Sequence, residues 1–350
     1  MSALALVMIV RNEERSLRRC LQSVTPFVDE LIILDTGSTD QTVAIATDMG
    51  AKVSHFTWCH DFSAARNAAL ALSHADWNLM LDADEWIMEG AEFLRAELRS
   101  STPFIGSVHI ANSINSSKNP EVSMSWAPRL VPRGTRFHGA IHEQPDSALP
   151  RRRLALKIAH DGYLPLHMEK KRERNEVLLR QALTKSPQDP YLLYQSGKNA
   201  EVYQNYHDAA EYYTQALLHT APTASYRHDL VVRTLFTLKK AHYLENAIQL
   251  ADSEMHNWQD SPDFFFALGD VFLDWAIQHP DKAESEILPL VEASWKKCLE
   301  IGERPELAGT VIGRGSHAAA LNLLILYEGL GNQREADKYR DMVLPAGVPV

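Results

Sequence analysis

Two aspartates separated by one residue follow a short apolar stretch, so their carboxylates can act together. Asp82 and Asp84 come directly after Trp77–Leu81, whose apolar side chains predict a buried strand. Two carboxylates at a strand end can hold a hard divalent cation such as Mg²⁺ or Mn²⁺, which neutralises a diphosphate and helps it to leave. The simpler interpretation is a solvated acidic loop, which would be preferred for an isolated motif.

Further polar groups follow earlier apolar stretches. Asn12 and Glu13 follow Ala3–Val10, while Asp35, Gly37 and Ser38 follow Leu31–Leu34. Asp35 offers a carboxylate acceptor for a donor on a base or ribose, and Gly37 permits close backbone approach. Arg66, at the start of an alanine-rich stretch, could reach a phosphate with its guanidinium group; the alternative is a surface ion pair.

These groups require a particular arrangement of strands and helices. Apolar stretches predict strands and helices in alternation along the first 81 residues: strands at 3–10, 31–34, 51–56 and 77–81, and helices at 42–49 and 63–72 and between the first two strands. This alternation is typical of a doubly wound parallel sheet, in which ligands bind beyond the carboxyl ends of the strands. Each polar group that ends a strand falls at that edge.

The chain then changes character twice. Between residues 106 and 163, the apolar stretches 107–110, 125–130 and 154–158 alternate with Pro and Gly, which predicts mixed or antiparallel edge strands. From residue 169 the pattern is helical, and Gly197, Ala209, Tyr213 and Ala216 have the spacing of a tetratricopeptide repeat (TPR). Looser repeat units begin near residues 261 and 318. We expect two domains, 1–165 and 166–350.

Several ordered strings resemble a known family. NEE (12–14), LDTGSTDQT (34–42), FSAARNAAL (62–70) and WNLMLDADEW (77–86) are similar to family-two nucleotide-sugar glycosyltransferases with the A-type fold. APRLVPRGTRFHGAIHEQ (127–144) and IAHDGY (158–163) resemble one branch, in which the transferase domain is fused to TPRs and which includes bacterial enzymes that glycosylate peptides. The resemblance implies an A-type, Rossmann-like α/β domain with a mostly parallel sheet, followed by an all-α, TPR-like domain.

The resemblance also implies residue roles on the donor side. Asp35 would contact the uracil or ribose of a nucleotide-sugar, although many members have two consecutive acids where this chain has Asp35-Thr36. Arg66 would face the nucleotide or its diphosphate. Asp82 and Asp84 would form the DxD motif, with Asp84 the more direct metal ligand. Glu85, which follows, would either take a direct catalytic part or stabilise and shape the site.

On the acceptor side, inverting transfer needs a general base, and a carboxylate suits that role. Glu143, in a position that resembles the family's acidic acceptor-site motif, is the predicted base; the alternative is a buried glutamate paired with Arg129 or Arg136. His142 and His160 are candidates for a third metal ligand, because imidazole is a common ligand at sites that accept Mn²⁺. With fifteen histidines in the chain, a structural role is the alternative for each.

Together these features predict a metal-dependent inverting glycosyltransferase that uses Mn²⁺ or Mg²⁺ and a UDP-sugar. The acceptor would be a protein or peptide hydroxyl or thiol, with the helical half positioning it or forming a homodimer. A lipopolysaccharide-core or other surface glycan is the alternative acceptor. A TPR scaffold with a silent transferase domain is an alternative of another class. A nucleotidyltransferase is less attractive, because no glycine-rich, lysine-containing loop follows the first strand.

Composition sets outer limits on function. The chain has 350 residues, 35 Lys and Arg against 45 Asp and Glu, and a formal net charge of −10, which argues against general nucleic-acid binding. Its three cysteines are too few for a disulfide framework. The first apolar stretch is too short to span a membrane and lacks a basic flank before it, so we expect no membrane segment or signal peptide and a cytoplasmic location.

Overall fold

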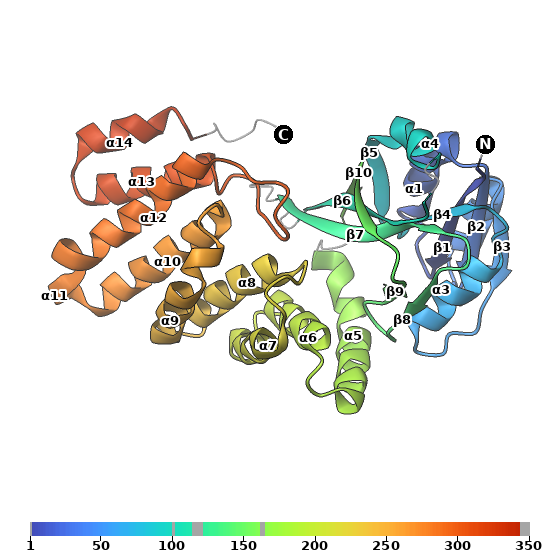
Figure 1. The fold of residues 1–350 in the computed structure, drawn as a ribbon, viewed down its shortest axis with the longest axis horizontal. Coiled ribbons are helices and arrows are strands. Elements are labelled where there is room, and N and C mark those ends of the chain that lie inside the picture. Colours follow the sequence, from blue (N-terminus) through green and yellow to red (C-terminus); the bar gives the residue numbers. More distant parts are fainter. Residues whose placement is uncertain (1, 100–101, 114–121, 162–164, 344–350) are drawn as a thin grey trace. The chain divides into compact units, whose positions relative to one another are not determined.

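The computed structural model describes residues 2–99, 102–113, 122–161 and 165–343, with only the backbone described for 113 and 165–173. The chain divides into two compact units (Figure 1). The first contains Met1–Ile114 and Ser125–Ala182; the second contains Asn115–Met124 and Leu183–Val350. The boundary expected near residue 165 adjoins residues 162–164, which lie outside the described part, and it stays a prediction.

The first unit is built on an eight-stranded sheet with the order β3-β2-β1-β4-β7-β6-β10-β5. Its strands are β1 (Leu4–Val10), β2 (Glu30–Asp35), β3 (Lys52–His55), β4 (Trp77–Met80), β5 (Glu85–Glu89), β6 (Ile105–Ser113), β7 (Val122–Pro132) and β10 (Arg151–His160). The first four pair in parallel, as do β6 and β10. The prediction of a mostly parallel, Rossmann-like sheet is confirmed.

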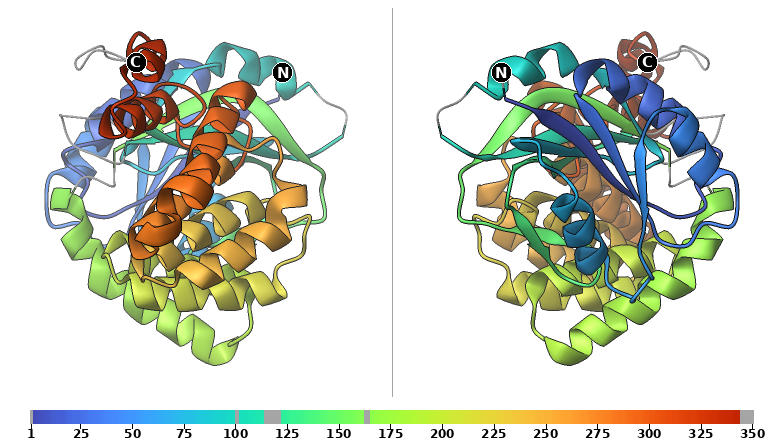
Figure 2. Two further views of the ribbon diagram at one scale, coloured as in Figure 1. Left: turned by 90° about the vertical axis from the view of Figure 1, so that its left-hand side faces the viewer. Right: turned by 90° about the vertical axis from the view of Figure 1, so that its right-hand side faces the viewer.

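Helices cover both faces of the central strands, which explains why β1 is apolar at every position. One face packs against α1 (Leu17–Val24) and α2 (Thr42–Asp48), where Leu4, Leu6 and Met8 meet Leu17 and Leu21. The other face packs against α3 (Phe62–Ala71) through a smaller apolar cluster, and this layering can be followed in Figure 2. A strand that is buried on both faces is apolar at successive positions, whereas a strand with one exposed face alternates apolar and polar residues.

The strands after residue 105 do not lie at the edge of the sheet, although their Pro and Gly content predicts edge strands. β7 pairs antiparallel with β4 inside the sheet, whereas the edges are β3 and β5. Pro132 is the last residue of β7, where it lies opposite Trp77, and Pro128 lies inside β7 but beyond the residues that pair with β4. Gly106 lies inside β6, where a Cβ would come within 2.7 Å of the Leu154 side chain and 2.9 Å of Leu130. The glycine therefore permits close packing within the sheet.

Two short strands, β8 (Arg136–His138) and β9 (Gln144–Asp146), form a separate antiparallel ribbon. The two strands of this ribbon flank the loop that carries Glu143. The later part of α5 (Pro165–Lys185) packs near this loop, because Leu178 and Leu179 share an apolar cluster with Ile141.

The second unit consists of helix hairpins, as its repeat spacing predicted. Its main helices are α6 (Pro190–Val202), α7 (Tyr206–His219), α8 (Arg227–Lys240), α9 (Leu244–Glu254), α10 (Pro262–Gln278), α12 (Leu288–Ile301), α13 (His317–Gly329) and α14 (Gln333–Arg340). Gly197 of α6 lies directly against the ring of Tyr213 of α7, and Gly269 of α10 against Trp295 of α12. The pair α8 and α9 was not predicted, because it lacks the small and aromatic positions at repeat spacing.

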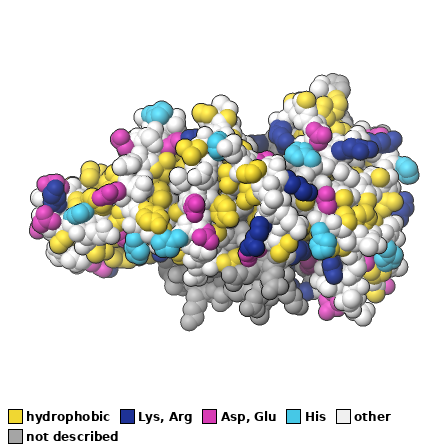
Figure 3. Space-filling view, turned by 90° about the horizontal axis from the view of Figure 1, so that it is seen from below, with side chains coloured by type: hydrophobic (Ala, Val, Ile, Leu, Met, Phe, Trp, Pro, Cys, Tyr) yellow, Lys and Arg dark blue, Asp and Glu magenta, His cyan; other side chains and the backbone are white. Residues whose placement is uncertain are grey.

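The surface of the molecule combines apolar and charged groups. Large apolar side chains such as Leu218, Ile277 and Ile325 remain exposed on the helical unit. On the face drawn in Figure 3, apolar side chains lie dispersed among charged ones. Within the described part of the chain, no helix is both long and apolar enough to cross a membrane.

Candidate active site

The turns after β1 and β2 are tied together by side-chain hydrogen bonds. The Asn12 backbone N–H donates to Ser38 Oγ (3.0 Å), and the Thr39 N–H donates to Asn12 Oδ1 (2.8 Å). The Glu13 N–H donates to Thr42 Oγ1 (2.7 Å). Asn12 adopts a positive φ of 56°, a conformation that asparagine tolerates better than most residues. The structure thus brings together the polar groups that follow the first two strands.

Asp35 occupies the end of β2 as a buried, well-bonded carboxylate. It accepts hydrogen bonds from the Gly37 N–H (3.1 Å) and the Ser38 N–H (3.1 Å), and His55 Nδ1 lies 3.3 Å away. Burial works to raise the pKa of Asp35, but the hydrogen bonds from Ser38, Gly37 and His55 outweigh it and the pKa lies below its ordinary value. Asp35 is therefore an ionised acceptor at the rim of the sheet.

The DxD motif forms the turn between β4 and β5. The Asp82 N–H donates to Glu85 Oε2 (3.0 Å), and the Glu85 N–H donates to the Asp82 carbonyl (3.0 Å). The Asp82 side chain is 42% exposed, whereas Asp84 and Glu85 retain only 7% and 2% of their accessible surface. The turn therefore presents one carboxylate to solvent and buries the next two acids.

Two arginines connect three carboxylates into a chain of alternating charge. Arg66 Nε donates to Glu143 Oε1 (2.6 Å), and its Nη2 lies 3.5 Å from Asp82 Oδ1. Arg129 Nη2 donates to Asp82 Oδ2 (2.7 Å) and to Glu85 Oε1 (2.5 Å). We call the series Glu143, Arg66, Asp82, Arg129 and Glu85 the site charge chain. Arg66 is thus in a buried ion pair rather than a surface one, and Glu143 pairs with Arg66.

In the site charge chain, burial shifts each pKa toward the neutral form, and the oppositely charged partners shift it back toward the ionised form. Burial would lower the pKa of Arg66, but Glu143 and Asp82 raise it above its ordinary value. Burial raises the pKa of Glu85 and Asp82 adds to the shift, although Arg129 acts in the opposite direction. Burial also works to raise the pKa of Asp82, but Arg129 and Arg66 lower it below its ordinary value. The two arginines therefore favour the ionised form of Asp82.

Asp84 lies beside His160, the last residue of β10. His160 Nε2 is 3.6 Å from Asp84 Oδ2, and His160 Nδ1 is 2.9 Å from Asn112 Oδ1. Burial would lower the pKa of His160, but its interactions with Asp84, Glu85 and Asp82 raise it above the ordinary value. The end of β10 thus contributes an imidazole to the DxD turn.

The four predicted metal ligands are not all gathered into one set. Asp84 and His160 lie together, Asp82 faces Arg66 and Arg129, and His142 is exposed on the loop before Glu143. Over the residues that the structure describes, no group of three or more His, Cys, Asp or Glu side chains could hold a metal ion. The donor chemistry nevertheless fits, because Mg²⁺ in particular uses one or two carboxylates and completes its shell with substrate phosphates and water.

Three residues near the site were not predicted to take part in it: Arg129, Asn112 and His55. Arg129 was considered only as a partner for Glu143. It lies next to Leu130, which pairs with Leu79 of β4, so its guanidinium reaches the DxD turn. Its position within the family-like string 127–144 was the sequence signal that could have marked Arg129 as a site residue. That string does not show which carboxylates Arg129 contacts.

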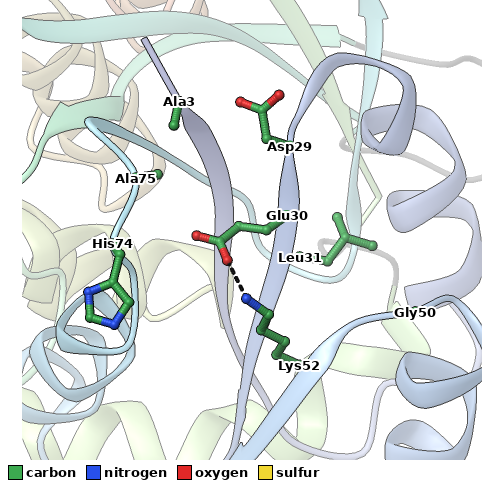
Figure 4. A pocket seen from close by; sticks show the side chains of 8 residues that line it. All are labelled: Ala3, Asp29, Glu30, Leu31, Gly50, Lys52, His74 and Ala75. Carbon is green, nitrogen blue, oxygen red and sulfur yellow. Dashed lines mark hydrogen bonds and ion pairs between the residues drawn. The ribbon is translucent and has the colours of Figure 1, made fainter.

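A surface pocket lies at the opposite edge of the sheet. It is lined by residues at or before the first positions of β1, β2, β3 and β4, among them Glu30, Lys52 and His74 (Figure 4). Lys52 Nζ donates to Glu30 Oε2 (2.8 Å), and the Lys52 side chain is 75% exposed. This is an ordinary surface ion pair. The pocket lies at the amino ends of the strands, so it is separate from the candidate active site at their carboxyl ends.

Comparison with known proteins relates parts of this chain to glycosyltransferases and to a repeat protein. Residues 5–117 match the family model described as glycosyl transferase family 2. A TPR repeat-containing protein of Synechococcus elongatus is 35% identical over 266 residues, covering 71% of this chain and 64% of that protein. The prophage-derived glycosyltransferase SunS of Bacillus subtilis is 26% identical over 254 residues, covering 69% of this chain and 60% of SunS.

Two solved structures align with parts of this chain. Glucosyl-3-phosphoglycerate synthase from Mycobacterium tuberculosis, in complex with Mn²⁺ and UDP-glucose, aligns with a TM-score of 0.27 and 25% identity over 32% of this chain and 44% of that one. MamA aligns with a TM-score of 0.39 and 16% identity over 50% of this chain and 88% of its own. At these TM-scores neither similarity supports a statement about function.

The fold thus combines a mostly parallel, Rossmann-like α/β unit with a unit of TPR-like helical repeats. The match to the model of glycosyl transferase family 2 lies almost entirely within the first unit. The chain spans 64% and 60% of the lengths of the two curated relatives described above.

Proposed function

We propose that this protein is a metal-dependent, inverting glycosyltransferase that moves a sugar from a UDP-sugar to a protein or peptide acceptor. The observation that carries this proposal is the site charge chain at the carboxyl ends of the strands, beside the Asp84–His160 pair. Two buried arginines among acidic groups offer both cation-binding and diphosphate-binding groups in one place.

On the donor side, Asp35 would accept a hydrogen bond from the base or ribose, supported by its position beyond β2 and its ionised state. Asn12, Glu13, Gly37 and Ser38 would shape that part of the site. Asp84 and His160 would hold Mn²⁺ or Mg²⁺, with Asp82 and His142 as further candidate ligands. When bound, the cation would neutralise charge on the departing diphosphate. Arg66 and Arg129 would supply positive charge to the same leaving group.

On the acceptor side, Glu143 would take the proton from the acceptor hydroxyl or thiol as that atom attacks the anomeric carbon. The bond from the sugar to the diphosphate oxygen breaks, and its electron pair leaves with the nucleoside diphosphate. Arg66 links the base to the leaving-group side, because it contacts both Glu143 and Asp82. Glu85 would position Arg129 rather than react, since it is buried beneath the turn.

A protein or peptide acceptor is supported by the helical repeats, since stacked repeats often bind extended peptides. The similarity to the glycosyltransferase SunS and to a TPR repeat-containing protein supports the combination of a transferase with repeats, and does not distinguish the acceptors. Supplying labelled UDP-sugars with either peptides or lipid-linked glycans would separate the two acceptor classes.

The decisive experiment changes both DxD aspartates. Asp82→Asn with Asp84→Asn should reduce donor hydrolysis and transfer by about 10³-fold or more, because electrostatic stabilisation of the leaving group is lost. The matched control is Asp76→Asn, which alters an exposed acid paired with Arg133 before β4. Undiminished transfer by the folded double variant would contradict the proposal. Absence of UDP binding in the presence of Mn²⁺ would favour a scaffold with a silent domain.

A further inference from the structure

Asn112 lies beside the histidine of the candidate active site on the neighbouring strand. β6 and β10 run parallel, and their register sets Asn112 opposite His160. Asn112 Oδ1 is 2.9 Å from His160 Nδ1. The distance is that of a normal hydrogen bond, so one of the two atoms must carry a proton.

The orientation of the Asn112 amide decides which atom that is. Its Nδ2 lies 3.0 Å from Ser125 Oγ and 3.4 Å from the Ile110 carbonyl oxygen. In the structure the amide nitrogen faces the Ile110 carbonyl oxygen, which can only accept, and the amide oxygen faces His160. Because the amide oxygen can only accept as well, His160 Nδ1 carries the proton.

The proton on Nδ1 determines the character of the other ring nitrogen. In a neutral imidazole with Nδ1 protonated, Nε2 carries the lone pair. That nitrogen is the one 3.6 Å from Asp84 Oδ2. When the ring is neutral, the lone pair therefore lies on the side nearest the DxD turn.

We propose that Asn112 is a positioning residue that holds His160 as the Nδ1–H tautomer and directs Nε2 to a divalent cation beside Asp84. This inference rests on the proposed function, since it assigns a supporting residue to the same cation site. A histidine ligand usually donates its other N–H to a supporting acceptor, which fixes both ring rotation and tautomer. Asn112 supplies that acceptor from β6, and Ser125 and Ile110 hold the amide in place.

Two variants at Asn112 distinguish the effect of its hydrogen-bond acceptor from the effect of its size. Asn112→Leu is similar in size but has no acceptor, whereas Asn112→Asp retains an oxygen that can accept from Nδ1–H. Nitrogen-15 NMR on the histidine-labelled 350-residue chain, at a pH above the pKa of His160, reports the tautomer. The variant His160→Gln identifies its resonance. Calorimetric titration with Mn²⁺ in the presence of UDP reports cation affinity.

We expect the unaltered chain and Asn112→Asp to show the Nδ1–H tautomer and Mn²⁺ affinities within about threefold of each other. Asn112→Leu should lose the tautomer preference and bind Mn²⁺ about 10- to 100-fold more weakly, the usual effect of removing such a support. The control Asn78→Leu, at a buried position in β4, should change neither readout.

The inference is overturned if Asn112→Leu keeps both the tautomer and the affinity, or if Asn112→Asp loses them to the same extent. Failure of the unaltered chain to bind Mn²⁺ with UDP would instead contradict the metal dependence in the proposed function. The NMR measurement would still decide whether Asn112 sets the tautomer.

Discussion

At the scale of single residues, the candidate active site depends on a few charged groups that are removed from water. Arg129 is held by Asp82 and Glu85, and Glu85 is almost completely buried. Removing one partner of a buried ion pair destabilises a protein more than replacing both partners by apolar residues. The reason is that the remaining charge stays buried without an opposite charge. Arg133, only four positions along the chain, pairs with Asp76 at an exposed site and provides a direct contrast.

We therefore predict that Arg129→Gln destabilises the first unit by about 3–5 kcal/mol, because it leaves Glu85 buried and unpaired. Arg133→Gln should cost less, about 1–2 kcal/mol, because it removes an exposed pair with Asp76 and hydrogen bonds to the backbone carbonyls of His74 and Ala75. Urea unfolding measures both. The double variant Arg129→Gln with Glu85→Gln should recover part of the loss, and the absence of any recovery would argue against the pairing as the cause.

At the scale of helices and strands, close contacts decide where small residues are required. Gly197 of α6 has no room for a side chain, because a Cβ would overlap the ring of the fully buried Tyr213 in α7. Gly329, in the last turn of α13, has open space instead, because a Cβ added there would meet no atom within 4 Å, and its φ is not positive. Two helical glycines in the same unit thus have opposite surroundings.

Gly197→Ala is predicted to lower the stability of the helical unit, because overpacking a rigid contact costs about 1–3 kcal/mol. That cost should exceed the gain of about 1 kcal/mol from alanine's helix propensity. Gly329→Ala keeps the propensity gain without the overlap and should leave the unit equally or more stable. Thermal unfolding followed by circular dichroism checks both, and a stabilised Gly197→Ala would show that α6 and α7 pack less closely than described.

At the scale of the whole molecule, both compact units contain buried carboxylates that are held ionised. Asp35 belongs to the first unit, and Asp229 of α8 belongs to the second. Arg233 Nε donates to both oxygens of Asp229 (2.9 and 3.0 Å), and the Tyr194 hydroxyl donates to it as well. Burial works to raise the pKa of Asp229, but Arg233, Lys198 and Tyr194 lower it below its ordinary value.

These shifts predict acid sensitivity with a definite sign. A carboxyl whose pKa is lower in the folded than in the unfolded chain stabilises the fold at any pH above its ordinary value of about 4. That contribution is lost as the pH falls through the lower, folded value. The stability difference between the unaltered chain and Asp229→Asn should therefore be largest near pH 7 and shrink below about pH 4. Urea midpoints across this range measure it, and a constant difference would contradict the ionic explanation.

Sequence alone was enough for much of the fold because the relevant patterns are local. The apolar stretches that predicted β1, β2, β3 and β4 each stand within one or two residues of the observed strands. The repeat spacing of Gly197 and Tyr213 predicted the hairpin of α6 and α7, because the glycine is needed where the ring packs. The order of the strands after β4 could not be predicted from the sequence. Apolar content and glycine content do not distinguish a central strand from a strand at the edge of the sheet.

Sequence likewise determined which acids stand at the DxD turn, because Asp82, Asp84 and Glu85 adjoin one another and follow a strand. Only the tertiary structure decided their partners. Arg66 reaches Glu143 across 77 positions, Arg129 reaches Asp82 across 47, and Asn112 reaches His160 across 48. Such pairs form because parallel and inserted strands carry distant residues to one edge of a sheet, and burial there leaves each charge dependent on the partner that packing supplies.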